Sequence, residues 1–118
     1  MNSAVNTPGS IYISHRAIAS IASQSALSSY GIVGLAAKNF AQSLSNILVK
    51  DPILGVDVSF NGLDIDIDIF VIVEYGTRIK SVASSVSESV KYQLENTTGL
   101  SVNQVNVHVR GLRISDPD

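Results

Sequence analysis

The chain has 118 residues, 45% of them hydrophobic and 15% charged, which is enough for one domain with its own core and excludes wholesale disorder. It contains no cysteine, so disulfides and thiolate metal sites are excluded. The formal net charge is −2, and the eight Lys and Arg residues are scattered along the chain, which argues against a nucleic-acid-binding surface.

The sequence predicts a cytoplasmic protein with no direct membrane insertion. Met1–Gly9 lacks the basic and apolar regions of a secretory signal, and the longest apolar run, Ile69–Val73, is far shorter than the ~20 residues of a membrane helix. We expect residues 1–8 to form a flexible leader, residues 9–112 a single domain and residues 113–118 a flexible tail.

The first half of the domain is predicted to contain one short strand and two helices. Ile11–Ile13 is typical of a strand, and Ser14 is well placed to cap a helix that ends near 28–31. A turn at Gly31–Gly34 then leads into a second helix from Leu35 to about residue 48, because apolar residues recur there at helical spacing.

A hairpin is predicted next. Val56–Phe60 alternates between apolar and polar residues, Asn61-Gly62 is a strong hairpin turn, and Asp64–Glu74 forms a long strand. The odd positions of the long strand should face the core: Ile65, Ile67, Ile69, Val71 and Val73.

A third helix and a last strand complete the domain. Tyr75-Gly76 closes the long strand, Thr77 is expected to cap the helix, and Gly99 is well placed as the residue just after it. The last strand presents valines on one face, and its other face carries Gln104, Asn106, His108 and Arg110.

The order β-α-α-β-β-α-β predicts an α+β fold, a two-layer sandwich with a small mixed sheet and helices on one face. A strand–helix–strand connection makes the last two strands parallel. The other face of the sheet is expected to be open in the monomer, because the three amphipathic helices can share one side.

Several stretches of the chain resemble one known family, the alkaline-shock and general-stress proteins of Gram-positive bacteria, an envelope stress response family. The stretches that carry the resemblance are Gly9–Ser14, Ile18–Ala22, Gly31–Gly34, Val71–Gly76, Thr98–Leu100 and Val105–Val109. Within the family motifs, structural roles are expected for Gly31, Gly34, Glu74, Tyr75, Gly76, Gly99 and Asn106.

The resemblance implies a non-enzymatic role in stress response and cell-envelope homeostasis. It implies no catalytic residues and no cofactor. Because some members of the family associate with the inner face of the cell membrane through a small membrane-anchored partner and self-assemble, it also implies a homo-oligomer with a membrane-anchored protein partner.

Three aspartates, Asp64, Asp66 and Asp68, share one face of the long strand at a spacing of about 7 Å. A calcium loop counted from Asp64 fails, because its sixth and twelfth positions hold Ile69 and Tyr75 instead of Gly and Glu. We therefore expect no metal site here, and favour a solvated strand face that discourages aggregation.

The two histidines do not predict catalysis. His15 is expected on the surface of the first helix, and His108 faces the open side of the sheet, where it can contact the aspartates if the two strands are neighbours. A base alone does not make an active site, so we expect no catalytic residues.

An alternative hypothesis is a KH-like nucleic-acid-binding domain that uses the Gly31–Gly34 loop, because KH domains place a GxxG loop between helices. Such loops carry basic residues, whereas this one holds Ile32 and Val33, and the nearest downstream cation is Lys38. Binding of nucleic acid is therefore not expected.

The favoured hypothesis is an interaction surface on the open sheet face. Phe70 and Ile72 would form its apolar centre, the typical anatomy of an interface, unless another part of the chain covers them. The polar residues expected to flank this centre are Asp66, Asp68, His108 and Arg110.

Overall fold

The structure is a computed structural model that describes residues 14–37 and 51–114. The predicted strand Ile11–Ile13 and the part of the predicted second helix beyond Ala37 lie outside the described residues. The elements are α1 (His15–Leu27), β1 (Ile32–Leu35), the short 3-10 helix η3 (Pro52–Gly55), β2 (Val56–Asn61), β3 (Asp64–Glu74), α2 (Ile79–Thr98) and β4 (Ser101–Arg113).

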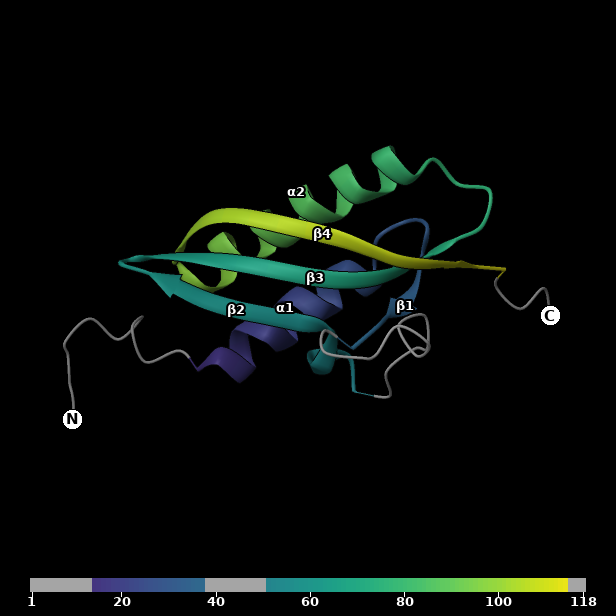
Figure 1. Cartoon of the computed structure of the whole chain (residues 1–118). Helices are drawn as coiled ribbons and strands as arrows, with labels where there is room; N and C mark the ends of the chain where they lie inside the picture. Colours follow the sequence, from purple (N-terminus) through teal and green to yellow (C-terminus); the bar gives the residue numbers. More distant parts are fainter. Residues whose placement is uncertain (1–13, 38–50, 115–118) are drawn as a thin grey trace.

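Strand β3 is the centre of the sheet (Figure 1). On one side it pairs antiparallel with β2 along its first half and with β1 near its end, so that β2 and β1 share one edge of β3. On the other side it pairs with β4 along its whole length, in parallel orientation. The mixed sheet and the parallel pairing of the last two strands are therefore confirmed, and β4 continues through Arg113, one residue beyond the predicted domain boundary.

The hairpin between β2 and β3 forms as the sequence predicts. Asn61 pairs with Asp64, which leaves Gly62 and Leu63 as the turn. Gly62 has a φ of +66°, a conformation that glycine adopts without steric cost. The hairpin fixes the register of β3, and with it the face on which each side chain lies.

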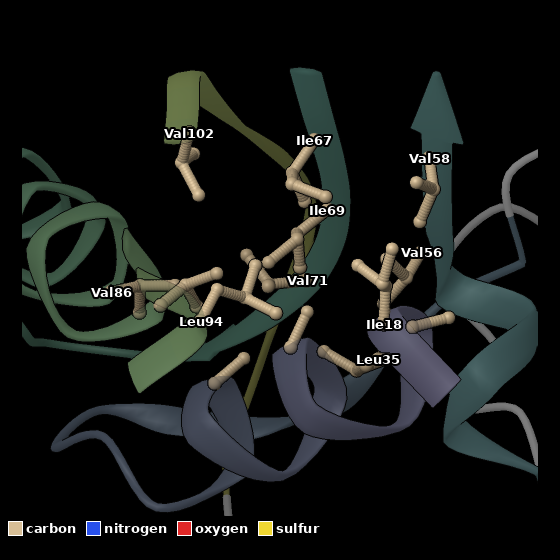
Figure 2. Packing of buried hydrophobic residues seen from close by; sticks show 14 of the residues in the cluster. Ile18, Leu35, Val56, Val58, Ile67, Ile69, Val71, Val86, Leu94 and Val102 are labelled. Carbon is tan, nitrogen blue, oxygen red and sulfur yellow. The ribbon is translucent and has the colours of Figure 1, made fainter. Parts of the chain in front are cut away.

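Helices α1 and α2 both cover one face of the sheet, which makes the two-layer α+β fold (Figure 1). The odd positions of β3 point into this layer and are fully buried, as expected (Figure 2). Each such side chain contributes about 1.5 to 3 kcal/mol of hydrophobic free energy. Their main partners under the helices are Ile18, Ala22, Leu35, Val56, Val86, Val90 and Leu94.

Three of the four predicted helix-end positions agree with the structure. The Ser14 side chain accepts a hydrogen bond from the Ala17 amide at 3.0 Å, and Gly99, with a φ of +76°, ends α2. Helix α1 ends at Leu27, close to the expected position. The prediction for Thr77 was wrong: Arg78 is the N-cap, and the Thr77 hydroxyl donates to the Glu74 carbonyl at 2.7 Å, because the turn after β3 extends one residue further.

Neither α1 nor α2 is long and apolar enough to cross a membrane. Helix α2 is also fixed to the sheet by a polar contact, since the Ser87 hydroxyl donates to the Val105 carbonyl of β4 at 3.2 Å.

The interpretation of Gly31–Gly34 as a turn was wrong beyond its first residue. Gly31 turns the chain with a φ of +88°, but Ile32–Leu35 is strand β1, and the expected helix does not begin at Leu35. Beyond the end of β2, the edge of β3 offers unpaired backbone groups, and this segment pairs with them instead of forming the helix that its apolar spacing predicts. One such contact is the hydrogen bond from Glu74 N–H to Gly31 O at 2.8 Å.

The KH-like hypothesis fails for the same reason. It needs a GxxG loop between two helices that is free to bind a backbone. Gly34 instead is buried in β1 and pairs with Ile72 of β3.

Replacing Gly31 with Ala should destabilise the domain more than replacing Gly76 with Ala. Both glycines have a positive φ, which costs an alanine about 1 kcal/mol. A Cβ at Gly31 would lie 2.6 Å from Val82 Cγ2, whereas a Cβ at Gly76 meets nothing within 4 Å. Overpacking should therefore add about 1 to 3 kcal/mol at Gly31 only.

Urea unfolding followed by circular dichroism measures both variants. Equal midpoints for Gly31→Ala and Gly76→Ala would contradict the packing argument.

Candidate interaction surface on the open sheet face

The face of the sheet turned away from α1 and α2 is called the open face below. The pairing register and the contacts of Phe70 place residues of three strands side by side on it. They are Asp57, Ser59 and Asn61 from β2, Asp64, Asp66, Asp68 and the aromatic Phe70 from β3, and Gln104, Asn106, His108 and Arg110 from β4.

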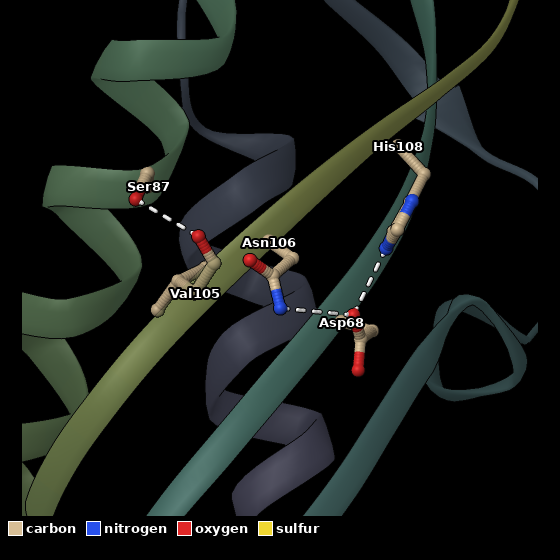
Figure 3. Close-up of polar contacts among 5 residues, drawn as sticks. All are labelled: Asp68, Ser87, Val105, Asn106 and His108. Atoms are coloured by element: carbon tan, nitrogen blue, oxygen red, sulfur yellow. Dashed lines mark hydrogen bonds and ion pairs between the residues drawn. The ribbon is translucent and has the colours of Figure 1, made fainter.

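Asp68 is the centre of a polar network on this face (Figure 3). Its Oδ1 accepts a hydrogen bond from Asn106 Nδ2 at 3.2 Å and lies 2.9 Å from His108 Nε2. An ionised carboxylate can only accept, so this contact requires a proton on Nε2 of His108. The predicted proximity of His108 to the aspartates is therefore present, and the parallel pairing of β3 with β4 produces it.

The aromatic ring of Phe70 contacts His108, a member of this network, and also Arg110. The His108 ring stacks on the Phe70 ring with centroids 4.7 Å apart and an interplanar angle of 15°. The guanidinium carbon of Arg110 lies 4.8 Å from the Phe70 centroid, a cation–π distance. Phe70 is consequently half-buried under two side chains of β4 instead of being a bare apolar centre.

Ile72 does not contribute to an accessible surface, so its place in the predicted apolar centre was wrong. It is fully buried, and it lies outside the core cluster beneath the helices. It pairs with Gly34 and Gly111, next to a register shift in each neighbouring strand. The chain after Gly34 stays buried through Ala37 and packs closely at this end of the sheet, since Ala36 N–H donates to Phe70 O at 2.9 Å.

Two aspartates of the open face have hydrogen-bond partners on β4. Asp66 accepts from Asn103 Nδ2 at 2.9 Å. Asp57 lies directly opposite Asp68 in the hairpin, an arrangement that is destabilising for two like charges unless a donor compensates. His108 supplies such a donor to Asp68. Over residues 14–37 and 51–114, no three His, Asp or Glu side chains form a group that could hold a metal ion.

The sequence did not single out Asn103, and no simple signal could have done so. The strict alternation of β4 would turn Asn103 away from the open face. A register shift between Ile65 and Asp66 adds one residue to β4 and brings Asn103 to Asp66.

The remaining predicted residues have structural positions near the ends of the sheet. Glu74 N–H is bound by the Gly31 carbonyl, Tyr75 N–H donates to Arg113 O at 2.9 Å, and Gly76 has a φ of +94°. His15 takes no part in the network around Asp68 and stacks on Phe60 of β2, with centroids 5.0 Å apart.

These features define a two-layer α+β domain with one helix-covered and one open sheet face, and comparison places it in a family. The model of the alkaline-shock protein 23 family, described as having a cell envelope-related function, matches residues 3–114. The chain belongs to this family, as the resemblance to alkaline-shock proteins implied.

Two curated relatives share nearly the whole chain. The uncharacterized protein YloU of Bacillus subtilis is 44% identical over 111 residues, covering 92% of this chain and 92% of its own length. The uncharacterized protein Spy1614 of Streptococcus pyogenes is 33% identical over 113 residues, covering 93% of each.

Solved structures with a similar fold include MamM-CTD. One MamM-CTD structure superposes with a TM-score of 0.51 at 14% identity, covering 81% of this chain and 96% of its own. A variant of the same domain in its zinc form gives 0.52 at 14% identity, with 86% and 89% covered. At this identity the likeness shows the fold alone.

Asp68 and His108 should show energetic coupling that Asp66 and His108 lack. The contact is partly exposed, so a double-mutant cycle of Asp68→Ala with His108→Ala should give a coupling of about 0.5 to 1 kcal/mol. Asp66 contacts Asn103, so Asp66→Ala and His108→Ala should be additive. Urea unfolding of the five variants and the wild type measures both cycles, and equal coupling in the two cycles would contradict the network described.

Proposed function

We propose that this chain is a non-enzymatic protein of cell-envelope homeostasis and stress response that self-associates and docks onto a membrane-anchored protein partner through its open face. The family description supports the link to the envelope. The stress response, the partner and a place at the inner face of the cell membrane are proposed from the resemblance to alkaline-shock proteins.

The observation that carries this proposal is the ordered cluster of Phe70, His108 and Arg110, held by Asp68. Aromatic and Arg side chains dominate the binding energy of protein interfaces. Here they are already fixed by stacking and hydrogen bonding in the free chain, so less side-chain entropy is lost when a partner binds.

The same geometry supports a non-enzymatic role. The side chains of His108 and Asp68 are 44% and 29% exposed on a sheet face. A reaction that uses a general base needs a substrate held beside the base and shielded from water. An exposed base on a flat face is better suited to contact with another surface.

Phe70→Ser should weaken assembly while the domain stays folded. It removes the ring on which His108 and Arg110 are stacked. The matched control is Phe60→Ser, since Phe60 also stacks on a histidine, but beside α1 instead of on the open face. Size exclusion with light scattering across concentration measures the mass of the wild type and both variants, and circular dichroism checks their fold.

The expected result is a concentration-dependent oligomer for the wild type and Phe60→Ser, and a shift toward monomer for Phe70→Ser. An equal effect of the two substitutions would remove the open face as the surface of self-association. A wild type that is strictly monomeric at high concentration would remove self-association from the proposal.

A further inference from the structure

Among the residues that the structure describes, the open face carries an excess of negative charge. The hairpin of β2 and β3 contributes four aspartates to it: Asp57, Asp64, Asp66 and Asp68. Strand β4 adds Arg110, and Glu74 and Arg113, opposite each other where both strands end, cancel. Four negative charges against one positive charge leave a net charge of −3 while His108 is neutral. This sum holds whichever groups pair within the domain.

The hydrogen bonds of these carboxylates do not remove their charge. Asp66 accepts from the Asn103 amide, and Asp68 accepts from the Asn106 amide (Figure 3). A side-chain amide is an uncharged donor, so it holds a carboxylate in place without neutralising it. His108, 2.9 Å from Asp68, compensates one negative charge only when its ring is protonated. The face is therefore both ordered and acidic.

The aspartates lie in line with the aromatic cluster of the same face. Asp66, Asp68 and Phe70 occupy successive outward positions of β3, about 7 Å apart. An extended chain repeats the side chains of one side at the same spacing. A segment that lies along β3 can therefore place basic residues over the aspartates and an apolar residue against the stacked rings of Phe70 and His108.

We propose that the open face binds an extended basic segment of its protein partner. The aspartates steer this segment and fix its register, and the cluster of Phe70, His108 and Arg110 supplies the anchoring contact. The inference rests on the proposed function and names the part of the membrane-anchored partner that is bound. Cytoplasmic segments next to a membrane helix carry an excess of Lys and Arg, so an anchor presents this chemistry close to the bilayer.

A second copy of the chain does not supply the complementary charge. Two open faces bring the same excess of aspartates, and like charges oppose their contact. Self-association, which depends on the stacked cluster around Phe70, works against this repulsion, whereas a basic segment relieves it. The aspartates therefore favour a basic partner over a second copy for the hairpin half of the face.

The test is fluorescence polarisation of the full chain with a short labelled peptide in which Lys alternates with Thr and one end carries Leu. We expect binding that weakens as sodium chloride is raised, and no binding when Glu replaces Lys in the peptide. A peptide of the same composition with its lysines consecutive should bind more weakly, because only half of them can face the aspartates.

Two substitutions with the same change in net charge locate the binding site. Asp66→Lys should weaken peptide binding about fivefold or more, because it reverses a charge on the open face. Glu88→Lys is the matched control, since Glu88 is exposed on α2, in the helix layer, and binding should be nearly unchanged. Asp66→Asn is a milder second variant that keeps an oxygen for Asn103 and should also weaken binding. Circular dichroism checks the fold of each variant.

Equal effects of Asp66→Lys and Glu88→Lys, or no binding of the alternating peptide, would overturn the proposal. Equal binding of the alternating and consecutive peptides would overturn the extended arrangement along β3. The self-association test stays separate, because it is made without peptide and depends on Phe70. A chain that oligomerises through Phe70 but does not bind the peptide would keep self-association and reject the basic segment. Peptide binding by a strictly monomeric chain would support the basic segment and reject self-association.

Discussion

In β3, each Ile or Val that faces the helices is followed by a residue that faces away from them, and the strand opens with three Asp residues on the outward side. The side chains that face the helices are all fully buried, and neighbouring strands pair with both edges of β3. A shift of one residue would place the aspartates under the helices and the isoleucines in water. Because burial of an unpaired carboxylate is costly, the alternation permits one register, and every other element is placed relative to it.

The network on the open face follows from this register together with the connection through α2. The hairpin alone would leave Asp57 and Asp68 opposite each other with like charges. The return of the chain as a parallel strand brings His108 and Asn106 beside Asp68 and supplies the donors. A repulsive pair within the hairpin is thus balanced by attractive contacts from β4, which is distant in sequence.

The sequence predicted the elements whose signals are local. The hairpin, the burial of alternate residues in β3, the cap at Ser14 and the glycine that ends α2 all depend on a few neighbouring residues. What it missed depends on pairing between distant segments. Ile32–Leu35 became a strand because β3 offered it an edge, and register shifts in β1 and β4 changed the surroundings of Ile72 and brought Asn103 to Asp66. The same distinction holds for the candidate surface. The alternation along β3 and β4 predicted which polar residues share a face. The burial of Ile72 and the cover over Phe70 could not be predicted, because they arise from packing at the end of the sheet.

The hydrogen bond from Ser87 to the Val105 carbonyl has a consequence for how copies of this domain can meet. Strand β4 lies at the side of β3 opposite β1 and β2, and long outer strands tend to recruit further strands into open-ended aggregates. A hydroxyl that occupies one carbonyl of β4 makes the addition of another strand along that border less favourable. Growth by extension of the sheet is thereby discouraged, while contact through its flat side stays open.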